Sequence, residues 1–157
     1  MPLGCGSPFP DHTLPDPSGA YHALSTAWSS GPALVLFGHG DCRTTREALP
    51  YLDRIQRHCP ASAGVLAVLQ DTAVAARALS TELGLALPLR LDGDPYRAAA
   101  GVRLTVVPTL FLVEQGGRVA GVSEALRRAD VVAFAQRLGV AMPLLDHADP
   151  LPELRPG

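Results

Sequence analysis

Cys42 stands at a position where the sequence favours a reactive thiol. It follows the apolar run 33–37 and the loop 38–41, and it precedes a segment whose apolar positions have helical spacing. Reactive groups in an open α/β sheet gather at the carboxyl ends of the strands. The first turn of a helix also offers a partial positive charge and unpaired N–H groups, and both stabilise a thiolate. The sequence therefore predicts that Cys42 is a nucleophile.

His39 and Arg43 are predicted auxiliary residues, because each can place positive charge beside this thiol, whereas Asp41 opposes them. All thirteen basic residues are arginine. Without lysine, such a charge must come from His39, Arg43 or Arg46. The absence of lysine also excludes Schiff-base chemistry and a P-loop lysine.

The other two cysteines are placed differently. Cys59 lies near the far end of the helix that Cys42 begins, and a rise of 1.5 Å per residue separates the two by about 25 Å. A disulfide needs Cα atoms within about 7 Å of one another, so these two cannot pair without melting the helix. Cys5 lies in a proline-rich arm and is the one candidate for a resolving cysteine.

The five histidines show no metal-ligand spacing, so no metal site is predicted.

Pro108 is the second informative residue, because it opens the apolar run 109–113. Proline cannot donate a ladder hydrogen bond and is normally confined to the starts or edges of strands. The sequence therefore predicts a strand that begins at Thr109, followed by a hairpin turn at Gly116-Gly117.

The elements that must position these residues form one α/β domain with a central mixed β-sheet flanked by helices and an N-terminal extended arm. Alternation of strands and helices at the front predicts parallel strands with helices on both faces, and the hairpin adds antiparallel strands. The arm and a short β/helix extension are predicted at 1–30, the core at 31–139, and a poorly fixed, proline-rich tail at 140–157. Strands are expected at 33–37, 64–69, 87–91, 109–113 and 118–122, and helices at 43–59, from the Asp71-Thr72 cap to 83, at 96–100, and from about Asp130 to Gly139.

The composition of the chain limits its fold class, its partners and its compartment. The chain has 157 residues, of which 47% are hydrophobic and 18% charged, and this suits one folded domain. The net charge is −2 with arginines scattered along the chain, so nucleic-acid binding is not expected. No apolar run is long enough to span a bilayer and no secretion signal is visible, so we expect a cytoplasmic protein without a membrane partner. The absence of lysine and asparagine, with a single isoleucine, indicates a GC-rich bacterial source.

The order of these features resembles the thioredoxin-like superfamily, in its AhpC/TSA and TlpA/ResA-like branch. The likeness covers about residues 6–139. It rests on the strand, loop, cysteine and proline within 33–52, the arm Phe9-Pro10-Asp11-His12-Thr13-Leu14-Pro15-Asp16, the stretch 92–101, and Val107-Pro108-Thr109-Leu110-Phe111-Leu112 with its hairpin. The resemblance implies a thioredoxin-like fold and a cis peptide bond before Pro108, which faces the redox cysteine.

The motif around the cysteine departs from that family. Its oxidoreductases typically carry Trp-Cys-x-x-Cys, whereas this sequence reads Asp41-Cys42-Arg43-Thr44-Thr45. Cys42 matches the nucleophilic cysteine, but Thr45 stands where the resolving cysteine belongs, so a dithiol cycle within the motif is impossible.

The leading hypothesis is therefore a monothiol thiol–disulfide oxidoreductase or isomerase. Cys42 attacks a disulfide, and an external low-molecular-weight thiol resolves the mixed disulfide. Thr45 is predicted to stabilise the thiolate through its hydroxyl, and the backbone beside Pro108 and Thr109 to pair with a substrate strand. The expected partners are protein or low-molecular-weight thiol and disulfide substrates, with no cofactor. The oligomeric state is left open.

Two other functions remain open. Loss of the tryptophan and of the second cysteine fits a non-catalytic binding module, in which Cys42 is merely exposed. Peroxiredoxins also resemble this fold and use Pro-x-x-x-Thr/Ser-x-x-Cys. Here Val35 and His39 stand at the proline and hydroxyl positions, so an atypical peroxiredoxin-like peroxidase is the second alternative.

Overall fold

The computed structural model describes residues 1–141 and 149–157. A five-stranded sheet crosses its centre in the order β5-β4-β3-β6-β7. The parallel strands are β3 (Ala33–Gly38), β4 (Gly64–Leu69) and β5 (Leu89–Leu91). The hairpin of β6 (Thr109–Val113) and β7 (Val119–Glu124) adds two antiparallel strands beside β3. The predicted mixed sheet is confirmed.

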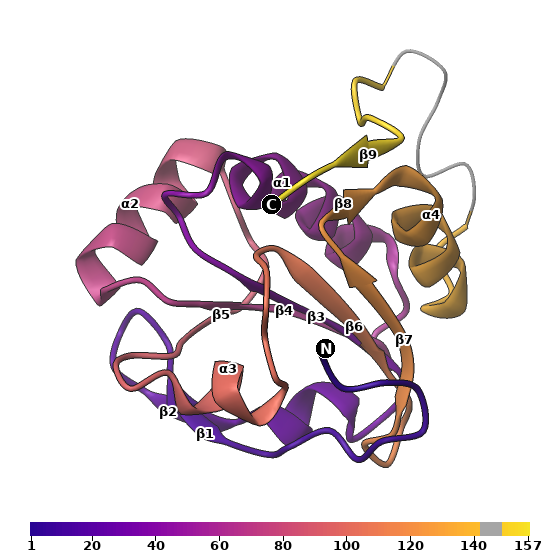
Figure 1. Ribbon diagram of the computed structural model, residues 1–157, viewed down its shortest axis with the longest axis horizontal. Helices are drawn as coiled ribbons and strands as arrows, with labels where there is room; N and C mark the ends of the chain where they lie inside the picture. The colour runs from indigo at the N-terminus through magenta and orange to yellow at the C-terminus, as the bar shows by residue number, and fades with distance from the viewer. Residues whose placement is uncertain (142–148) are drawn as a thin grey trace.

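Helices cover both faces of this sheet (Figure 1). One face carries α1 (Arg43–His58), α2 (Ala73–Leu83) and α4 (Arg128–Arg137). The other face carries the 3-10 helix η1 (Leu24–Trp28), α3 (Arg97–Gly101) and the hairpin of β1 (Thr13–Pro15) with β2 (Tyr21–Ala23). In the part of the chain that the structure describes, no helix has the length and apolar composition needed to cross a bilayer.

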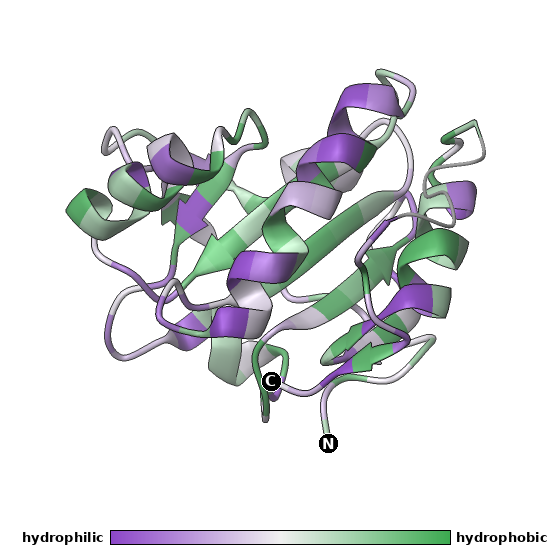
Figure 2. Cartoon of the chain, turned by 90° about the horizontal axis from the view of Figure 1, so that it is seen from above, coloured by the Kyte–Doolittle hydropathy of each residue, from purple (hydrophilic) through white to green (hydrophobic). Residues whose placement is uncertain are grey.

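Two apolar cores form because successive side chains of a strand point to opposite faces of the sheet. Leu34 and Leu36 of β3 join the core beneath α1, α2 and α4. Val35 and Phe37 join the second core on the other face, together with Phe9 of the N-terminal arm. Both faces of the central strands are therefore buried, which explains their continuous apolar runs. Figure 2 shows these strands in green, whereas the helices carry many purple, hydrophilic positions.

The ends of the helices follow local sequence signals. Thr72 caps α2, because its Oγ1 accepts a hydrogen bond from the Ala75 N–H at 3.2 Å. Gly84 ends the same helix with a φ of 64°, in the left-handed region that glycine adopts readily. The predicted start of the last helix near Asp130 is wrong by two residues, since α4 begins at Arg128.

Asp92 is a buried carboxylate with only 1% of its surface exposed. It follows β5 and accepts hydrogen bonds from the N–H groups of Ala98 at 3.1 Å and Ala99 at 2.8 Å. These donors belong to the first turn of α3, so the carboxylate fixes this helix to the sheet. The next turn contains a cis peptide bond between Asp94 and Pro95.

Residues 149–157 differ from the poorly fixed tail that the sequence predicts. Leu151 is 4% exposed and belongs to the core beneath α1 and α4. β9 (Leu154–Arg155) pairs antiparallel with β8 (Leu126–Arg127). One buried leucine among prolines gives no periodic signal, so the sequence pattern did not reveal this packing. Residues 142–148 of the predicted tail lie outside the described residues.

Replacing Asp92 with alanine should destabilise the fold. Asp92→Ala leaves two buried N–H groups of α3 without their acceptor, so we expect a loss of about 2–4 kcal/mol in the free energy of unfolding. Urea denaturation followed by circular dichroism measures this loss. Asp94→Ala is the matched control, because Asp94 is exposed and its removal should change the free energy by less than about 0.5 kcal/mol. Equal losses in the two variants would contradict the role of Asp92.

Candidate active site around Cys42

The register between β3 and β6 brings the two informative positions of the sequence together. Phe37 near the end of β3 pairs with Thr109 at the start of β6. Because these strands are antiparallel, Val107 and Pro108 lie beside the end of β3, where the loop to α1 begins. Cys42 closes that loop as the N-cap residue of α1.

The thiol of Cys42 faces the chain just before Pro108. It is partly exposed, and its S–H donates to the carbonyl oxygen of Val107 at 3.5 Å. The backbone N–H of Cys42 donates to the His39 carbonyl oxygen at 3.0 Å, which closes the turn before the helix. The sulfur therefore remains within reach of a substrate, at a helix end whose dipole favours negative charge.

The segment on the far side of the thiol is held by Pro108 and Thr109. The peptide bond between Val107 and Pro108 is cis, as the family resemblance implies. The Pro108 carbonyl oxygen accepts from the Ala125 N–H at 2.9 Å. Thr109 is fully buried, and its hydroxyl donates to the Val106 carbonyl oxygen at 2.7 Å. These bonds fix the turn that presents the Val107 carbonyl to the thiol.

Thr45 lies fully buried in the first turn of α1. Its Oγ1 accepts from the His39 N–H at 3.4 Å, so the side chain ties the loop to the helix. That bond leaves the hydroxyl proton of Thr45 able to donate. The role predicted for Thr45, stabilisation of a Cys42 thiolate, stays a prediction.

Asp71, which the sequence predicts only as part of a helix cap, belongs to the site. Its side chain is 6% exposed, and one carboxylate oxygen accepts from the Gly40 N–H at 2.9 Å. The other oxygen lies 3.9 Å from Nδ1 of His39, and this Nδ1 accepts from the Asp41 N–H at 3.0 Å. Asp71 thus holds the loop before Cys42. Aspartate and threonine both cap helices, so the sequence does not show that Thr72 caps α2 while Asp71 binds the loop.

The two arginines predicted to add positive charge are paired with carboxylates. Arg43 has an 82% exposed side chain, and its Nε lies 3.2 Å from Oε1 of Glu47. Arg46 pairs with Glu82 and donates to the Gly40 carbonyl oxygen at 3.2 Å. Each cation therefore has a nearby compensating charge, which leaves the end of α1 as the electrostatic feature closest to the thiol.

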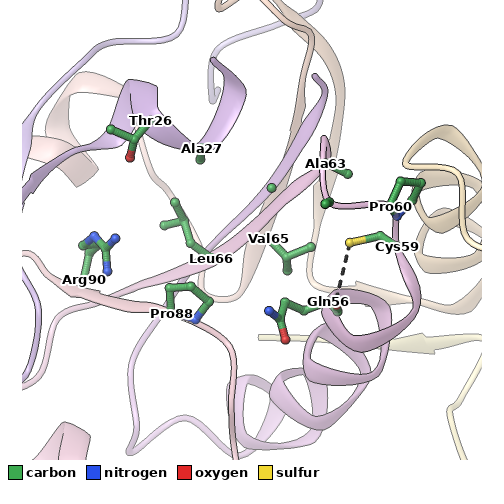
Figure 3. Close-up of a pocket in the computed structure, with 12 residues that line it drawn as sticks. Thr26, Ala27, Gln56, Cys59, Pro60, Ala63, Val65, Leu66, Pro88 and Arg90 are labelled. Carbon is green, nitrogen blue, oxygen red and sulfur yellow. Dashed lines mark hydrogen bonds between the residues drawn. The ribbon is translucent and has the colours of Figure 1, made fainter. Parts of the chain in front are cut away.

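Cys59 lies at the opposite end of α1, as helix geometry predicts. It lines a cavity of about 320 Å³ between α1, η1 and β4 (Figure 3). Its thiol donates to the Gln56 carbonyl oxygen at 3.5 Å. Burial raises the pKa of this thiol. Cys59 is therefore a structural cysteine placed away from the Cys42 site.

Cys5 lies along the edge strand of the sheet. Its thiol donates to the Ala120 carbonyl oxygen of β7 at 3.4 Å. The β7 residue opposite Thr109 is Glu124, four positions further along the strand, or about 13 Å. All three cysteines are free. The structure thus places Cys5 apart from Cys42, and its role as a resolving cysteine stays a prediction.

Within the described ranges 1–141 and 149–157, no group of three or more His, Cys, Asp and Glu side chains could hold a metal ion. The arrangement at Cys42 offers a partly exposed sulfur beside backbone donors and acceptors.

Solved structures share this architecture, although no family model and no curated protein matches the sequence. A chain from Chlorobium tepidum, provisionally described as a thiol:disulfide interchange protein DsbE, matches with a TM-score of 0.76 and 24% identity over 86% of this chain and 95% of its own. The thioredoxin domain of a thiol-disulfide oxidoreductase from Bacteroides vulgatus gives 0.73 and 20% identity over 85% and 96%. This chain has a thioredoxin-like fold. Peroxidoxin BcpB from Mycobacterium tuberculosis gives 0.70 and 16% identity over 85% and 97%.

The thioredoxin-like fold thus gathers part of the predicted site. It brings the Cys42 thiol against Val107 and cis-Pro108, with Thr45, Thr109 and His39 holding the two backbone segments. Arg43 is turned to Glu47, and neither Cys5 nor Cys59 joins the group. The sequence does not predict that Val107 and Asp71 belong to the site. For Val107, the one indication in the sequence is the proline that follows it.

Gly38→Ala should loosen the attachment of α1 to the sheet. A Cβ at Gly38 would lie 2.5 Å from Cγ2 and 2.9 Å from Oγ1 of the buried Thr45. We expect this overpacking to cost about 1–3 kcal/mol in the free energy of unfolding. Gly93→Ala is the control, because a Cβ there has no atom within 4 Å. Thermal unfolding compares the two variants, and equal midpoints would refute the contact.

Cys59 should react slowly with iodoacetamide at neutral pH. Its raised pKa keeps the thiolate fraction small. Its alkylation rate should therefore still be rising above about pH 8.5, where a free cysteine is half ionised. Peptide mass spectrometry separates its rate from that of the exposed Cys5. Equal rates for both cysteines at pH 7 would show that burial does not protect Cys59.

Proposed function

We propose that this protein carries out thiol–disulfide exchange through Cys42, as an oxidoreductase or isomerase of the monothiol type. The observation that carries the proposal is the place of the thiol, at the head of α1 and 3.5 Å from the carbonyl oxygen that precedes cis-Pro108. Its partial exposure allows a small disulfide to reach the sulfur. The fold is shared with proteins named as thiol-disulfide oxidoreductases, which supports the same class of chemistry.

The exchange proceeds in two balanced steps. The Cys42 thiolate attacks one sulfur of a substrate disulfide, so a Cys42–substrate disulfide forms and the other substrate sulfur leaves as a thiolate. A low-molecular-weight thiolate then attacks the substrate sulfur of this mixed disulfide. A new disulfide joins the substrate to the small thiol, and Cys42 leaves as the thiolate. The protein gains and loses no electrons over the cycle.

The chain's own groups serve these steps. Backbone N–H groups in the first turn of α1 stabilise negative charge on the sulfur before attack and after release. The Val107 carbonyl holds the protonated thiol in place, and the proton goes to solvent when the thiolate forms. The Thr45 hydroxyl, whose oxygen is already bonded to the His39 N–H, can donate its own proton to the thiolate.

An external thiol is the resolver in this proposal, because the other cysteines lie elsewhere. Cys59 lies at the far end of α1, and the Cys5 thiol is hydrogen-bonded to the Ala120 carbonyl oxygen of β7. The cytoplasmic location expected from the sequence is part of the proposal, since a reducing compartment supplies small thiols. The substrates are protein or low-molecular-weight disulfides.

Cys42→Ser should abolish exchange, because a hydroxyl does not attack a disulfide sulfur. With hydroxyethyl disulfide as substrate and glutathione as resolver, we expect the wild-type rate to fall at least about a hundredfold. Mass spectrometry of the wild type, quenched before glutathione is added, should show the hydroxyethylthio adduct on Cys42. Cys59→Ser is the control and should retain the activity. Full activity of Cys42→Ser would end this proposal.

Two alternative functions have one observation each in their favour. A binding module is favoured by the contacts that residues 154–157 of the chain make beside Cys42, where the Thr44 hydroxyl donates to the Pro156 carbonyl oxygen; it predicts partner binding that survives Cys42→Ser and no adduct. A peroxidase is favoured by the likeness to peroxidoxin BcpB. Valine and histidine carry no hydroxyl, however, so neither Val35 nor His39 offers one to a peroxide. Consumption of hydrogen peroxide that depends on Cys42 would support the peroxidase instead.

A further inference from the structure

The segment 149–157 reaches the surface beside the Cys42 thiol. β9 runs beside β8, close to α1 (Figure 1). The carbonyl oxygen of Pro156 then accepts a hydrogen bond from the Thr44 hydroxyl, two residues after Cys42. Gly157 lies so close to Val107 that a Cβ there would overlap the Val107 carbonyl oxygen. That oxygen is also the acceptor of the Cys42 thiol, so Gly157 and the reactive sulfur share one neighbour.

The segment is held largely through its backbone. Nη1 of Arg128 donates to the Leu151 carbonyl oxygen at 2.9 Å, and the Arg128 N–H donates to that of Glu153 at 3.2 Å. β9 adds its pairing with β8. An ion pair from Nε of Arg155 to Oε2 of Glu47, at 3.0 Å, adds a side-chain contact. Bonds of the backbone depend little on side-chain identity, so another extended polypeptide could make them in the same place.

The segment is held firmly at one point and weakly beyond it. Leu151 is buried in the core and anchors the chain. Beyond it, β9 has only two residues, and the Arg155 side chain is 41% exposed, so solvent weakens its ion pair with Glu47 without abolishing it. A cavity of about 420 Å³ remains between α1 and the segment, lined by Tyr51 and Arg54 among others. Residues 154–157 are therefore attached less firmly than Leu151.

We propose that residues 154–157 form a strap that occupies the place of an extended polypeptide substrate beside Cys42. The surface it covers consists of the edge of β8, Thr44, Glu47 and Val107, and it fits an extended segment with a basic side chain opposite Glu47. A polypeptide disulfide must displace the strap before it reaches the sulfur, whereas a small disulfide needs less room. The substrate class in this inference rests on the proposed function, but the obstruction by the strap does not.

The test compares how fast Cys42 is modified by a polymer-linked maleimide and by iodoacetamide, in the full chain and after removal of residues 154–157. Leu151 is retained in both. If the strap is closed about nine-tenths of the time, its removal should raise the rate ratio of the bulky to the small reagent about tenfold at Cys42. Peptide mass spectrometry reads the rate at Cys42 apart from those at the other cysteines.

A point variant tests the strap without a deletion, because a deletion could change reactivity by disturbing the fold. Arg155→Ala removes the ion pair to Glu47 without shortening the chain and should raise the same ratio by a smaller factor than the deletion, whereas Arg97→Ala, at an exposed position of α3 on the other face of the sheet, should not. An unchanged ratio in both strap variants would overturn the proposal, and so would an equal rise with both reagents, because that indicates a change in the thiol rather than in access. Alkylation does not require disulfide exchange, so failure of the proposed function and failure of the strap give different results.

Discussion

The antiparallel register between β3 and β6 is the constraint on which the site depends. Pairing of Phe37 with Thr109 leaves Val107 and Pro108 beside the end of β3, where the loop turns into α1. A shift by one residue would turn Phe111 and its neighbours to the opposite face of the sheet, and both buried cores oppose such a shift. The same packing that stabilises the fold therefore sets the 3.5 Å contact between the Cys42 thiol and the Val107 carbonyl.

Buried polar side chains then fix the loops that this register brings together. The Asp71 carboxylate accepts a hydrogen bond from the Gly40 N–H, and the Thr45 hydroxyl oxygen accepts one from the His39 N–H. The Thr109 hydroxyl donates to the Val106 carbonyl oxygen. Leaving such a backbone group unpaired in the interior would cost about 1–3 kcal/mol, so each side chain fixes one conformation of its loop. The nearby arginines contribute less, because Arg43 and Arg46 are satisfied by carboxylates.

Local sequence patterns predict most of the strands and helices and the position of the reactive cysteine. The apolar runs, Thr72 and Gly84 defined strands and a helix, and the lone cysteine after a strand marked the site. Contacts between distant segments were not predictable in the same way. Asp71 and Thr72 both belong to residue types that cap helices, and only the tertiary structure shows that Thr72 is the cap here. Likewise, the burial of Leu151 depends on a hollow between α1 and α4 that no local pattern encodes.

In the proposed cycle one thiol suffices for exchange, so the sharpest test is a chain in which Cys42 is the sole cysteine. The double variant Cys5→Ser with Cys59→Ser should catalyse exchange between a small disulfide and glutathione at a rate within about twofold of the wild type, since the external thiol resolves the mixed disulfide. Loss of turnover, with the Cys42 adduct accumulating unresolved, would show that a second cysteine of the chain takes part and would contradict the account.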